Sequence, residues 1–215
     1  MQYFDAKDGK VVLLKMVKAI QENKQYLGDI DGLIGDGDHG MNMNKGFTVF
    51  ETRHGQEDYT LSEGFDMLSQ ILMNEIGGSM GPIYGTVFGA LSEDCEELEE
   101  ITLPDLAKMV AYSLSELQDI VDAQVGDKTL VDALSPAADS LKASAEAGES
   151  FADALAKMKA AAEAGRDATK DMVAKFGRSS RLGERSRGVL DAGATSCSLL
   201  IGALADGINE GLKEK

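Results

Sequence analysis

The sequence Asp31-Gly-Leu-Ile-Gly-Asp36-Gly-Asp38-His39-Gly-Met-Asn42-Met-Asn44 separates the first two helical patterns of the chain and carries its densest group of reactive side chains. At about 5 Å and an effective dielectric constant near 20, each pair of ionised carboxylates repels by roughly 3 kcal/mol. A divalent cation removes that repulsion, and Mg2+ is usually bound by a few carboxylates together with substrate phosphates. The glycines allow the backbone to turn so that the aspartates face one point. The segment therefore predicts a magnesium site, although Asp and Gly are also ordinary residues of a solvated turn.

Two common motifs do not explain this segment. The spacing Gly35-x-Gly37-x-x-Gly40 matches the dinucleotide fingerprint, which requires a strand before it and a phosphate on the following helix. Here the preceding residues have a helical pattern, and the two aspartates between the glycines would repel that phosphate. An EF-hand requires a glutamate at the end of its loop, whereas counting from Asp31 places Asn42 there.

The composition narrows the class of ligand. The chain has 215 residues, of which 43% are hydrophobic, and its 21 Lys and Arg against 37 Asp and Glu give a net charge of −16. This charge argues against nucleic acid or an anionic membrane surface as a partner. A phosphate substrate would need a cation between itself and the protein.

The cysteines and the hydropathy pattern suggest a cytoplasmic protein. Cys95 and Cys197 form no disulfide framework and fit reduced thiols. No apolar run approaches the length of ~18 residues that a membrane span needs, and Lys15 and Lys18 interrupt the N-terminal pattern. We therefore expect neither a membrane-spanning segment nor a signal peptide.

Helical periodicity dominates the chain. The first amphipathic pattern, with Leu13, Met16, Val17 and Ile20 on one face, is expected to end before Gly28. Since no period-two strand pattern is found, we expect an all-α fold of about eight helices in a single domain, residues 1–215. The expected helices are 9–26, 41–51, a third capped by Thr60 or Ser62 and ending near 76, 83–91, 103–121 capped by Thr102, 129–146, a seventh capped by Ser150 and reaching at least 164, and a last one from 191 to beyond 203.

Two breaks between the helices have the composition of anion sites. Gly77-Gly-Ser-Met-Gly-Pro82 resembles the start of a helix whose free N–H groups attract anions, and it is equally consistent with a tight turn. The segment Gly177–Gly188 contains four arginines in an otherwise acidic protein. Guanidinium groups bind phosphate oxygens in pairs, so this segment is either a phosphate clamp or a solvated loop with surface ion pairs.

Taken together and in order, these motifs resemble one family. Gly35–Met43, Gly77–Pro82, Gly126-Asp-Lys-Thr129, Gly177–Ser186 and Asp191–Thr195 are similar to the nucleotide-binding L subunit of dihydroxyacetone kinase, of the type linked to the phosphotransferase system. By itself, Gly126-Asp-Lys-Thr129 does not have the glycine spacing of a P-loop.

The resemblance implies an eight-helix antiparallel barrel with a nucleotide site at one end and a lid loop, residues 177–190. It implies two Mg2+ ions held by Asp31, Asp36 and Asp38, with these three residues and Arg178 as the catalytic residues. The ADP or ATP contacts that it implies are His39, Gly40, Met41, Asn42, Gly78, Ser79, Leu130, Arg178, Asp191, Ala192 and Gly193.

The implied activity is phosphoryl transfer through bound ADP/ATP to dihydroxyacetone, or a similar short ketose, held by a separate K subunit. A phosphohistidine carrier protein would recharge the nucleotide, although ATP as the donor remains an alternative. The resemblance also leaves open a role as a nucleotide-loaded adaptor for a transcription regulator, and a homodimer. A Mg2+-dependent phosphate-ester hydrolase is a weaker alternative, because beyond His39 the sequence offers no candidate base.

The chain departs from the family pattern at three places. Ile120-Val121-Asp122 replaces an arginine- and glycine-rich segment, Leu130 replaces a methionine, and Asp191-Ala-Gly193 replaces Asp-Pro-Gly. His39 stands where the related fatty-acid kinases have threonine, which favours the sugar-kinase branch.

Overall fold

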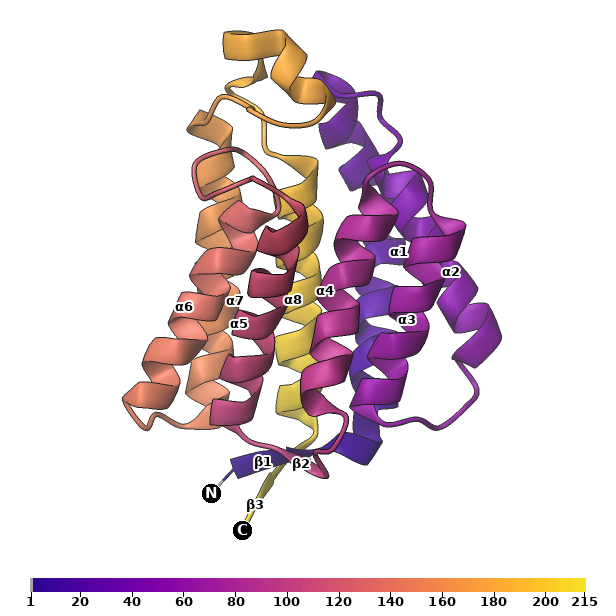
Figure 1. Ribbon diagram of the computed structural model, residues 1–215, viewed down its shortest axis with the longest axis vertical. Coiled ribbons are helices and arrows are strands. Elements are labelled where there is room, and N and C mark those ends of the chain that lie inside the picture. The colour runs from indigo at the N-terminus through magenta and orange to yellow at the C-terminus, as the bar shows by residue number, and fades with distance from the viewer. Residues whose placement is uncertain (1) are drawn as a thin grey trace.

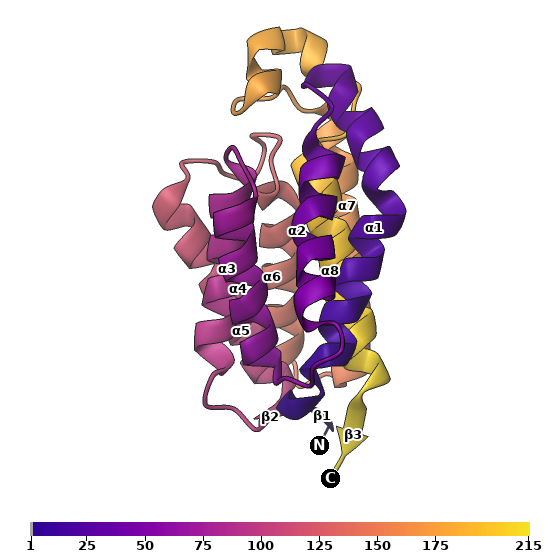
Figure 2. The same ribbon diagram turned by 90° about the vertical axis from the view of Figure 1, so that its right-hand side faces the viewer.

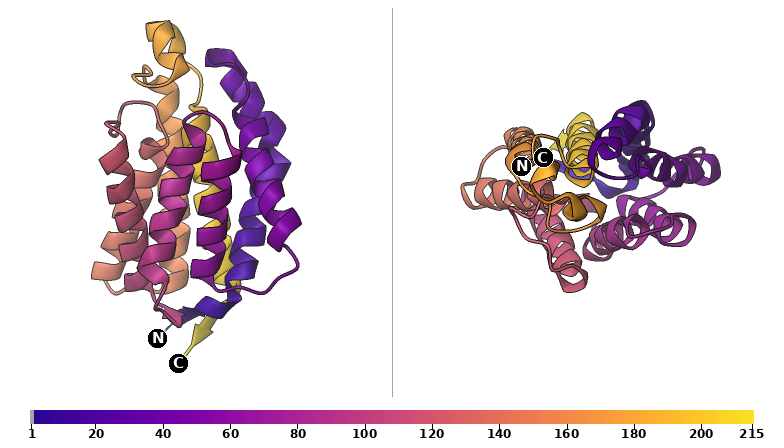
Figure 3. Two further views of the ribbon diagram at one scale, coloured as in Figure 1. Left: turned by 45° about the vertical axis from the view of Figure 1, so that its right-hand side comes forward. Right: turned by 90° about the horizontal axis from the view of Figure 1, so that it is seen from above.

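The computed structural model describes residues 2–215 and shows α-helices that run alternately up and down (Figure 1). Each helix packs against the next one along the chain, and the last returns to the first, so that the helices form a closed ring (Figure 3). The prediction of an all-α antiparallel barrel is therefore confirmed. The helices are α1 (Gly9–Ile34), α2 (His39–His54), α3 (Leu61–Glu75), α4 (Met80–Cys95), α5 (Leu103–Ile120), α6 (Val131–Glu146), α7 (Phe151–Ala168) and α8 (Ala192–Glu210).

The alternation of directions determines what lies at each end of the barrel. The helices α2, α4, α6 and α8 all begin at the end where α1 finishes, which is the upper end in Figure 1. The first turn of a helix leaves N–H groups without backbone partners and carries a partial positive charge. The fold therefore gathers four helix N-termini at the end that also carries the aspartates.

The first helix is longer than predicted. It was expected to end before Gly28, but α1 continues through Gly28 and Gly32 to Ile34. A Cβ on Gly40 would overlap the Lys24 carbonyl oxygen and lie 2.8 Å from the Gly28 amide nitrogen. The glycines thus serve the close approach of α1 and α2, and this packing outweighs the roughly 1 kcal/mol by which each glycine disfavours a helix.

The helix caps follow the sequence closely. Thr60 begins α3 with a capping box, in which the Glu63 carboxylate accepts the Thr60 backbone N–H at 2.7 Å. The Thr102 backbone N–H donates to Asp105 at 2.9 Å before α5, and the Asp153 backbone N–H donates to Ser150 Oγ at 3.1 Å before α7. These caps were predicted, because a side chain that satisfies a free N–H is a local property of the sequence.

A small antiparallel sheet closes the opposite end, where the prediction of no strand was wrong. Its strands are β1 (Gln2–Asp5), β2 (Glu100–Ile101) and β3 (Leu212–Glu214), in the order β2-β1-β3. Phe4 of β1, fully buried, is paired with Ile101 and Leu212. Strands of two to four residues are too short for an alternating pattern to be visible in a sequence.

The interior is one continuous apolar cluster that receives side chains from every α-helix. The rings of Phe47 and Phe88 meet edge to face, with centroids 6.2 Å apart, which is a favourable aromatic geometry. Three short 3-10 segments, η1 (Ala6–Asp8), η2 (Thr169–Asp171) and η3 (Arg178–Ser186), complete the described elements. Within residues 2–215, no helix combines the length and the apolar character needed to cross a membrane.

Replacing Gly40 by alanine tests the close contact between α1 and α2. Because the added Cβ would meet the backbone of α1 and not a flexible side chain, we expect Gly40→Ala to lower the free energy of unfolding by about 1–3 kcal/mol. Urea unfolding monitored by circular dichroism measures this change. Gly77→Ala is the matched control, since a Cβ there meets nothing within 4 Å. Equal stability of the two variants would contradict the packing argument.

Candidate functional site

Three carboxylates converge at the junction between α1 and α2. Asp31 lies in the last turn of α1, and Asp36 and Asp38 follow in the connecting loop. Each offers an oxygen atom, and these atoms all lie within 4.8 Å of one another. Within residues 2–215 this is the only group of its kind that could hold a metal ion. The structure thus brings together the three residues that the sequence identified.

Local backbone geometry creates this convergence. The Gly35 N–H donates to the Asp31 carbonyl oxygen at 2.5 Å and ends α1, while Gly37 adopts a positive φ of 77° that reverses the chain. The first backbone N–H of α2, from His39, then donates to the Asp31 carboxylate at 3.3 Å. Because Asp31 is held within a helix and Asp38 directly precedes another, the cluster is attached to the rigid part of the barrel.

The donor set fits a hard divalent cation. All three ligands are carboxylate oxygens, which Mg2+ prefers over nitrogen or sulfur. Asp31 and Asp38 are half-buried and Asp36 is exposed, so the protein covers one side of the cluster while solvent reaches the other. This arrangement leaves room for a ligand that completes the coordination of the ion.

The His39 side chain has a structural role and does not act as an acid or a base. Its ring is buried, and its Nε2 lies 2.8 Å from the Ser196 hydroxyl of α8. Burial lowers the pKa of His39 to about 4, against the opposing effect of Asp31. The imidazole is therefore neutral at pH 7. It joins the start of α2 to α8.

Tyr84 and Ser196 complete this connection, and sequence reasoning missed both. The Tyr84 hydroxyl of α4 lies 2.6 Å from Ser196 Oγ and donates to the Gly193 carbonyl oxygen at 3.2 Å. Burial raises the pKa of Tyr84 well above its usual value, so it stays protonated. These contacts link α2, α4 and α8. No local sequence pattern predicts them, because the residues are distant in the chain.

The starts of α6 and α8 also touch. A Cβ on Gly193 would lie 3.5 Å from the Leu130 amide nitrogen. Asp191 caps α8 by accepting the Ala194 N–H at 2.7 Å. Burial raises the pKa of Asp191 to about 6, outweighing that hydrogen bond and the attraction of Lys128. Leu130, Asp191 and Gly193, which the family resemblance predicts as nucleotide contacts, thus lie together. Ala192, between Asp191 and Gly193, is buried.

The remaining predicted residues lie on the rim of the same end. Met41 is exposed, and the Asn42 N–H donates to the Asp38 carbonyl oxygen at 2.9 Å. Gly78, with a positive φ of 72°, and Ser79 are exposed directly before α4. A Cβ on Gly78 would meet nothing within 4 Å, so this turn borders open space.

The loop between α5 and α6 is organised by an aspartate that sequence reasoning overlooked. Buried Asp132 accepts the N–H groups of Gly126 at 2.6 Å and Thr129 at 2.7 Å. The signal was present, since an acidic residue three positions after Thr129 is a local turn-forming pattern. The hydrogen bonds to Asp132 of α6 therefore fix the loop that carries Lys128.

The arginine-rich segment, residues 177–190, projects from the end of the barrel beside the end of α1 (Figures 1 and 2). Residues Arg178–Ser186 form 3-10 turns. Arg178 makes an ion pair with Asp36, whereas Arg187 pairs with Glu184 at 3.1 Å. The ion pair places Arg178 at the acidic cluster, and both alternatives for this segment, a phosphate clamp and a solvated loop with surface ion pairs, allow such a contact.

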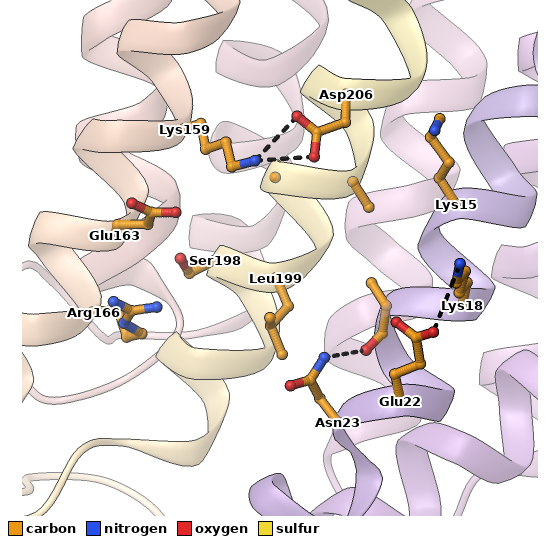
Figure 4. Close-up of a pocket in the computed structure, with 13 residues that line it drawn as sticks. Lys15, Lys18, Glu22, Asn23, Lys159, Glu163, Arg166, Ser198, Leu199 and Asp206 are labelled. Atoms are coloured by element: carbon orange, nitrogen blue, oxygen red, sulfur yellow. Dashed lines mark hydrogen bonds and ion pairs between the residues drawn. The ribbon is translucent and has the colours of Figure 1, made fainter. Parts of the chain in front are cut away.

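A second concavity lies elsewhere, on the flank of the barrel over α1, α7 and α8 (Figure 4). This groove has a volume of about 280 Å³, and the small residues Gly202 and Ala203 of α8 form part of its floor. Two ion pairs lie within its lining, Lys159 with Asp206 at 2.9 Å and Lys18 with Glu22 at 3.7 Å. The groove contains none of the predicted site residues.

The fold and the site define a class of protein: an antiparallel α-helical barrel with a carboxylate cluster and exposed helix N-termini at one end. A model of the DAK2 domain matches residues 33–206, and the chain belongs to the DAK2 domain family. The resemblance inferred from the motifs is thereby confirmed.

Its relatives include two bacterial subunits of nearly the same length. The chain is 36% identical to the ADP-binding subunit DhaL of PEP-dependent dihydroxyacetone kinase 1 from Listeria innocua, over 86% of this chain and 88% of that one. It is 39% identical to the ADP-binding subunit DhaL of PTS-dependent dihydroxyacetone kinase from Lactococcus lactis, over 89% and 92%.

Among solved structures, the dihydroxyacetone kinase of C. freundii has the same fold. In its native form it superposes with a TM-score of 0.70 at 23% identity, over 93% of this chain and 34% of that chain. The chain therefore spans about one third of that kinase.

Removing Arg178 should strengthen the binding of a metal ion in the absence of nucleotide. The guanidinium occupies Asp36 and repels a cation, so we expect Arg178→Ala to raise the affinity for Mg2+ alone by roughly two- to five-fold, the range of an exposed ion pair. Isothermal titration calorimetry measures this affinity. Arg181→Ala, in the same segment, should leave it unchanged, and a weaker affinity in Arg178→Ala would refute the competition.

Asp191 should make stability depend on pH. Its pKa of about 6 in the folded protein exceeds the ordinary value of 3.8, so the folded state binds the proton more tightly. This stabilisation is present at low pH and is lost as pH rises through 6. Asparagine also caps helices but does not ionise. Between about pH 4 and pH 7, Asp191→Asn should therefore gain up to about 2 kcal/mol relative to the unsubstituted protein. Metal-free urea unfolding tests this, and a constant difference would contradict it.

Proposed function

We propose that this chain is the nucleotide-binding subunit of a dihydroxyacetone kinase, and that it passes a phosphoryl group to dihydroxyacetone held by a separate subunit. The observation that carries the proposal is the set of three carboxylates within 4.8 Å at the end of the barrel where four helices begin. The relatives of matching length are named ADP-binding subunits of such kinases, which supports the same ligand here.

Asp31, Asp36 and Asp38 would hold Mg2+, in the form of two ions. When bound, Mg2+ neutralises phosphate charge during phosphoryl transfer. The protein contributes three carboxylates. The backbone N–H of His39 donates a hydrogen bond to the Asp31 carboxylate and orients it. Because the chain carries a net charge of −16, a nucleotide phosphate would otherwise meet strong repulsion.

The helix N-termini would bind the nucleotide. Residues 39–42 at the start of α2, Gly78 and Ser79 before α4, Leu130 before α6 and Asp191–Gly193 at the start of α8 all lie at this end. Free N–H groups at helix starts donate hydrogen bonds to anionic oxygens. The hydrogen bonds of Ser196 to His39 and Tyr84 keep three of these helices in register, so the N–H groups are preorganised.

Arg178 and the arginine-rich segment would act as the lid. Arg178 already lies against Asp36, where a phosphate group on the metal ion would also be. An arginine at that position balances the negative charge of the transition state. Closing the segment over the nucleotide would exclude water and favour transfer over hydrolysis.

Exposed apolar side chains support docking of protein partners at the same end. In residues 2–215 the large apolar side chains that solvent reaches lie toward the site end, with the exception of Val11. They include Leu33, Met41, Met73, Ile120, Val125 and Phe176, around the rim of the barrel. Their concentration at one end of the barrel is what supports a protein interaction surface there. The K subunit and the phosphohistidine carrier are the partners that the function requires, in a cytoplasmic setting.

A kinase that uses ATP directly is the second candidate. The chain is 31% identical to the L-erythrulose kinase of Pectobacterium atrosepticum and 33% identical to the D-erythrulose kinase of Mycolicibacterium smegmatis, but it spans only 32% and 33% of their lengths. Four relatives of similar length are named as subunits of PEP- or PTS-dependent kinases. We therefore favour recharging by a phosphocarrier and dihydroxyacetone as the acceptor.

Ligand-induced stabilisation tests the nucleotide site directly. At ligand concentrations about 100 times Kd, Mg2+ with ADP should stabilise the native protein by about 2.7 kcal/mol, which raises the melting temperature. Asp36→Asn should abolish this gain, because it removes one carboxylate of the cluster. Asp139→Asn, an exposed aspartate of α6, is the matched control and should behave like the unsubstituted protein. Equal melting curves with and without ligands would refute the nucleotide site.

A reconstituted transfer assay tests the reaction. The purified chain, a K subunit and a phosphocarrier should convert dihydroxyacetone to its phosphate, and omission of this chain should stop turnover. Binding to a transcription regulator without any turnover would favour the adaptor role instead. Release of phosphate from ATP without an acceptor would favour hydrolysis.

A further inference from the structure

The arginine-rich segment is joined to the barrel by two stretches of chain that lie side by side, which we call the neck: residues 169–171 and 187–191. The Gly188 N–H donates to the Lys170 carbonyl oxygen at 2.7 Å, and the Asp191 N–H donates to Thr169 Oγ1 at 3.0 Å. The Arg187 guanidinium also contacts the Asp171 carbonyl oxygen. These bonds hold the segment at a single place on the end of the barrel.

Lys128 reaches into the neck from the loop between α5 and α6. Its side chain is 1% exposed, and its ammonium group donates to the Thr169 carbonyl oxygen at 2.6 Å and to the Val189 carbonyl oxygen at 2.5 Å. The two acceptors lie on opposite stretches of the neck. One side chain therefore connects the stretch that enters the segment to the stretch that leaves it.

The position of Lys128 carries two energetic costs. A buried ammonium group is costly unless nearby groups compensate its charge. Burial lowers the pKa of Lys128, although the carboxylates of Asp191, Asp132 and Asp171 oppose that shift from a distance. The Lys128 φ of 62° is also left-handed, which lysine rarely adopts. The two hydrogen bonds to carbonyl groups of the neck are therefore the direct partners of this buried ammonium group.

Asp127, the residue before Lys128, also connects the loop between α5 and α6 to the arginine-rich segment, through Lys175. The Lys175 N–H donates to the Asp127 carbonyl oxygen at 3.2 Å, and the Lys175 ammonium group binds the Asp127 carboxylate at 2.5 Å. The loop itself is fixed by Asp132 of α6. Residues 126–129 are thus held by Asp132 on the barrel side, and they bind the neck and Lys175 of the chain that leads into the arginine-rich segment.

We infer that Lys128 is a positioning residue that clamps both sides of the neck and thereby sets the arginine-rich segment over the acidic cluster, where Arg178 meets Asp36. Lys128 does not contact the nucleotide in this role, because its ammonium group is committed to the two neck carbonyl groups. Its effect on nucleotide binding passes through Arg178. That consequence rests on the proposed function, whereas the clamp itself does not.

Hydrogen exchange of the ligand-free protein tests the clamp. Lys128→Met keeps the length and apolar stem of the side chain but removes the donors. Losing two buried hydrogen bonds from a charged group should speed exchange of the amides in residues 172–190 by roughly 10- to 100-fold. Amides of α3 and α4 should keep their protection. Lys170→Met, which removes an exposed lysine of the neck, is the matched control and should change neither.

The alternatives have distinct outcomes. Unchanged exchange in residues 172–190 overturns the clamp, and equal acceleration throughout the barrel shows that Lys128 only supports the fold. If Lys128→Met does not fold, Lys128→Arg and Lys128→Gln carry the comparison. Arginine keeps the charge and the donors and should protect the segment, whereas glutamine is too short to reach both carbonyl groups and should expose it. The reverse order overturns the inference.

A double-mutant cycle on Mg2+-ADP affinity tests the route through Arg178. Lys128→Met should weaken binding by about ten-fold in the unsubstituted background and by less than about two-fold in Arg178→Ala, because residues that act through one another are not additive. Additive losses overturn this route. If the unsubstituted protein does not bind Mg2+-ADP, the proposed function fails, but the exchange experiment still decides whether Lys128 clamps the neck.

Discussion

The mutual repulsion of Asp31, Asp36 and Asp38 is the constraint on which the site end of the barrel depends. Three carboxylates within 4.8 Å cost several kcal/mol when ionised and unpaired, by the estimate of roughly 3 kcal/mol per pair. In the structure Arg178 compensates Asp36 and the first N–H of α2 compensates Asp31. These are modest compensations, and a divalent cation among the oxygens, as we propose, would remove the repulsion that remains.

The topology of the barrel places the positive N-termini of four helices at the end that carries this cluster. An up-and-down barrel whose first helix ends at the aspartates must start α2, α4, α6 and α8 at the same end, and each start contributes free N–H groups. The hydrogen bonds that Ser196 makes with His39 and Tyr84 lock three of these starts together. At the opposite end, the three-stranded sheet joins the two termini and carries none of the site residues.

Sequence reasoning succeeded where the signal is local. The clustering of the aspartates, the caps at Thr60 and Ser150, and the helical periodicity are properties of neighbouring residues. The structure confirms the caps and the helices and brings the three aspartates together. Sequence reasoning failed where distant residues decide. Gly28 looked like a helix end because its contact with Gly40 is invisible in sequence, and Lys128 gave no sign that it contacts Val189. The family resemblance gave the barrel, but not the bonds that hold its site together.

A crystal structure of the protein with Mg2+ and ADP is the most direct test of the proposed metal and nucleotide site. We expect electron density for a metal ion between Asp31, Asp36 and Asp38, bound also by phosphate oxygens, with Arg178 turned from Asp36 toward the nucleotide. Aspartates that point into solvent with no ion between them, while ADP is bound elsewhere or not at all, would contradict the proposed site.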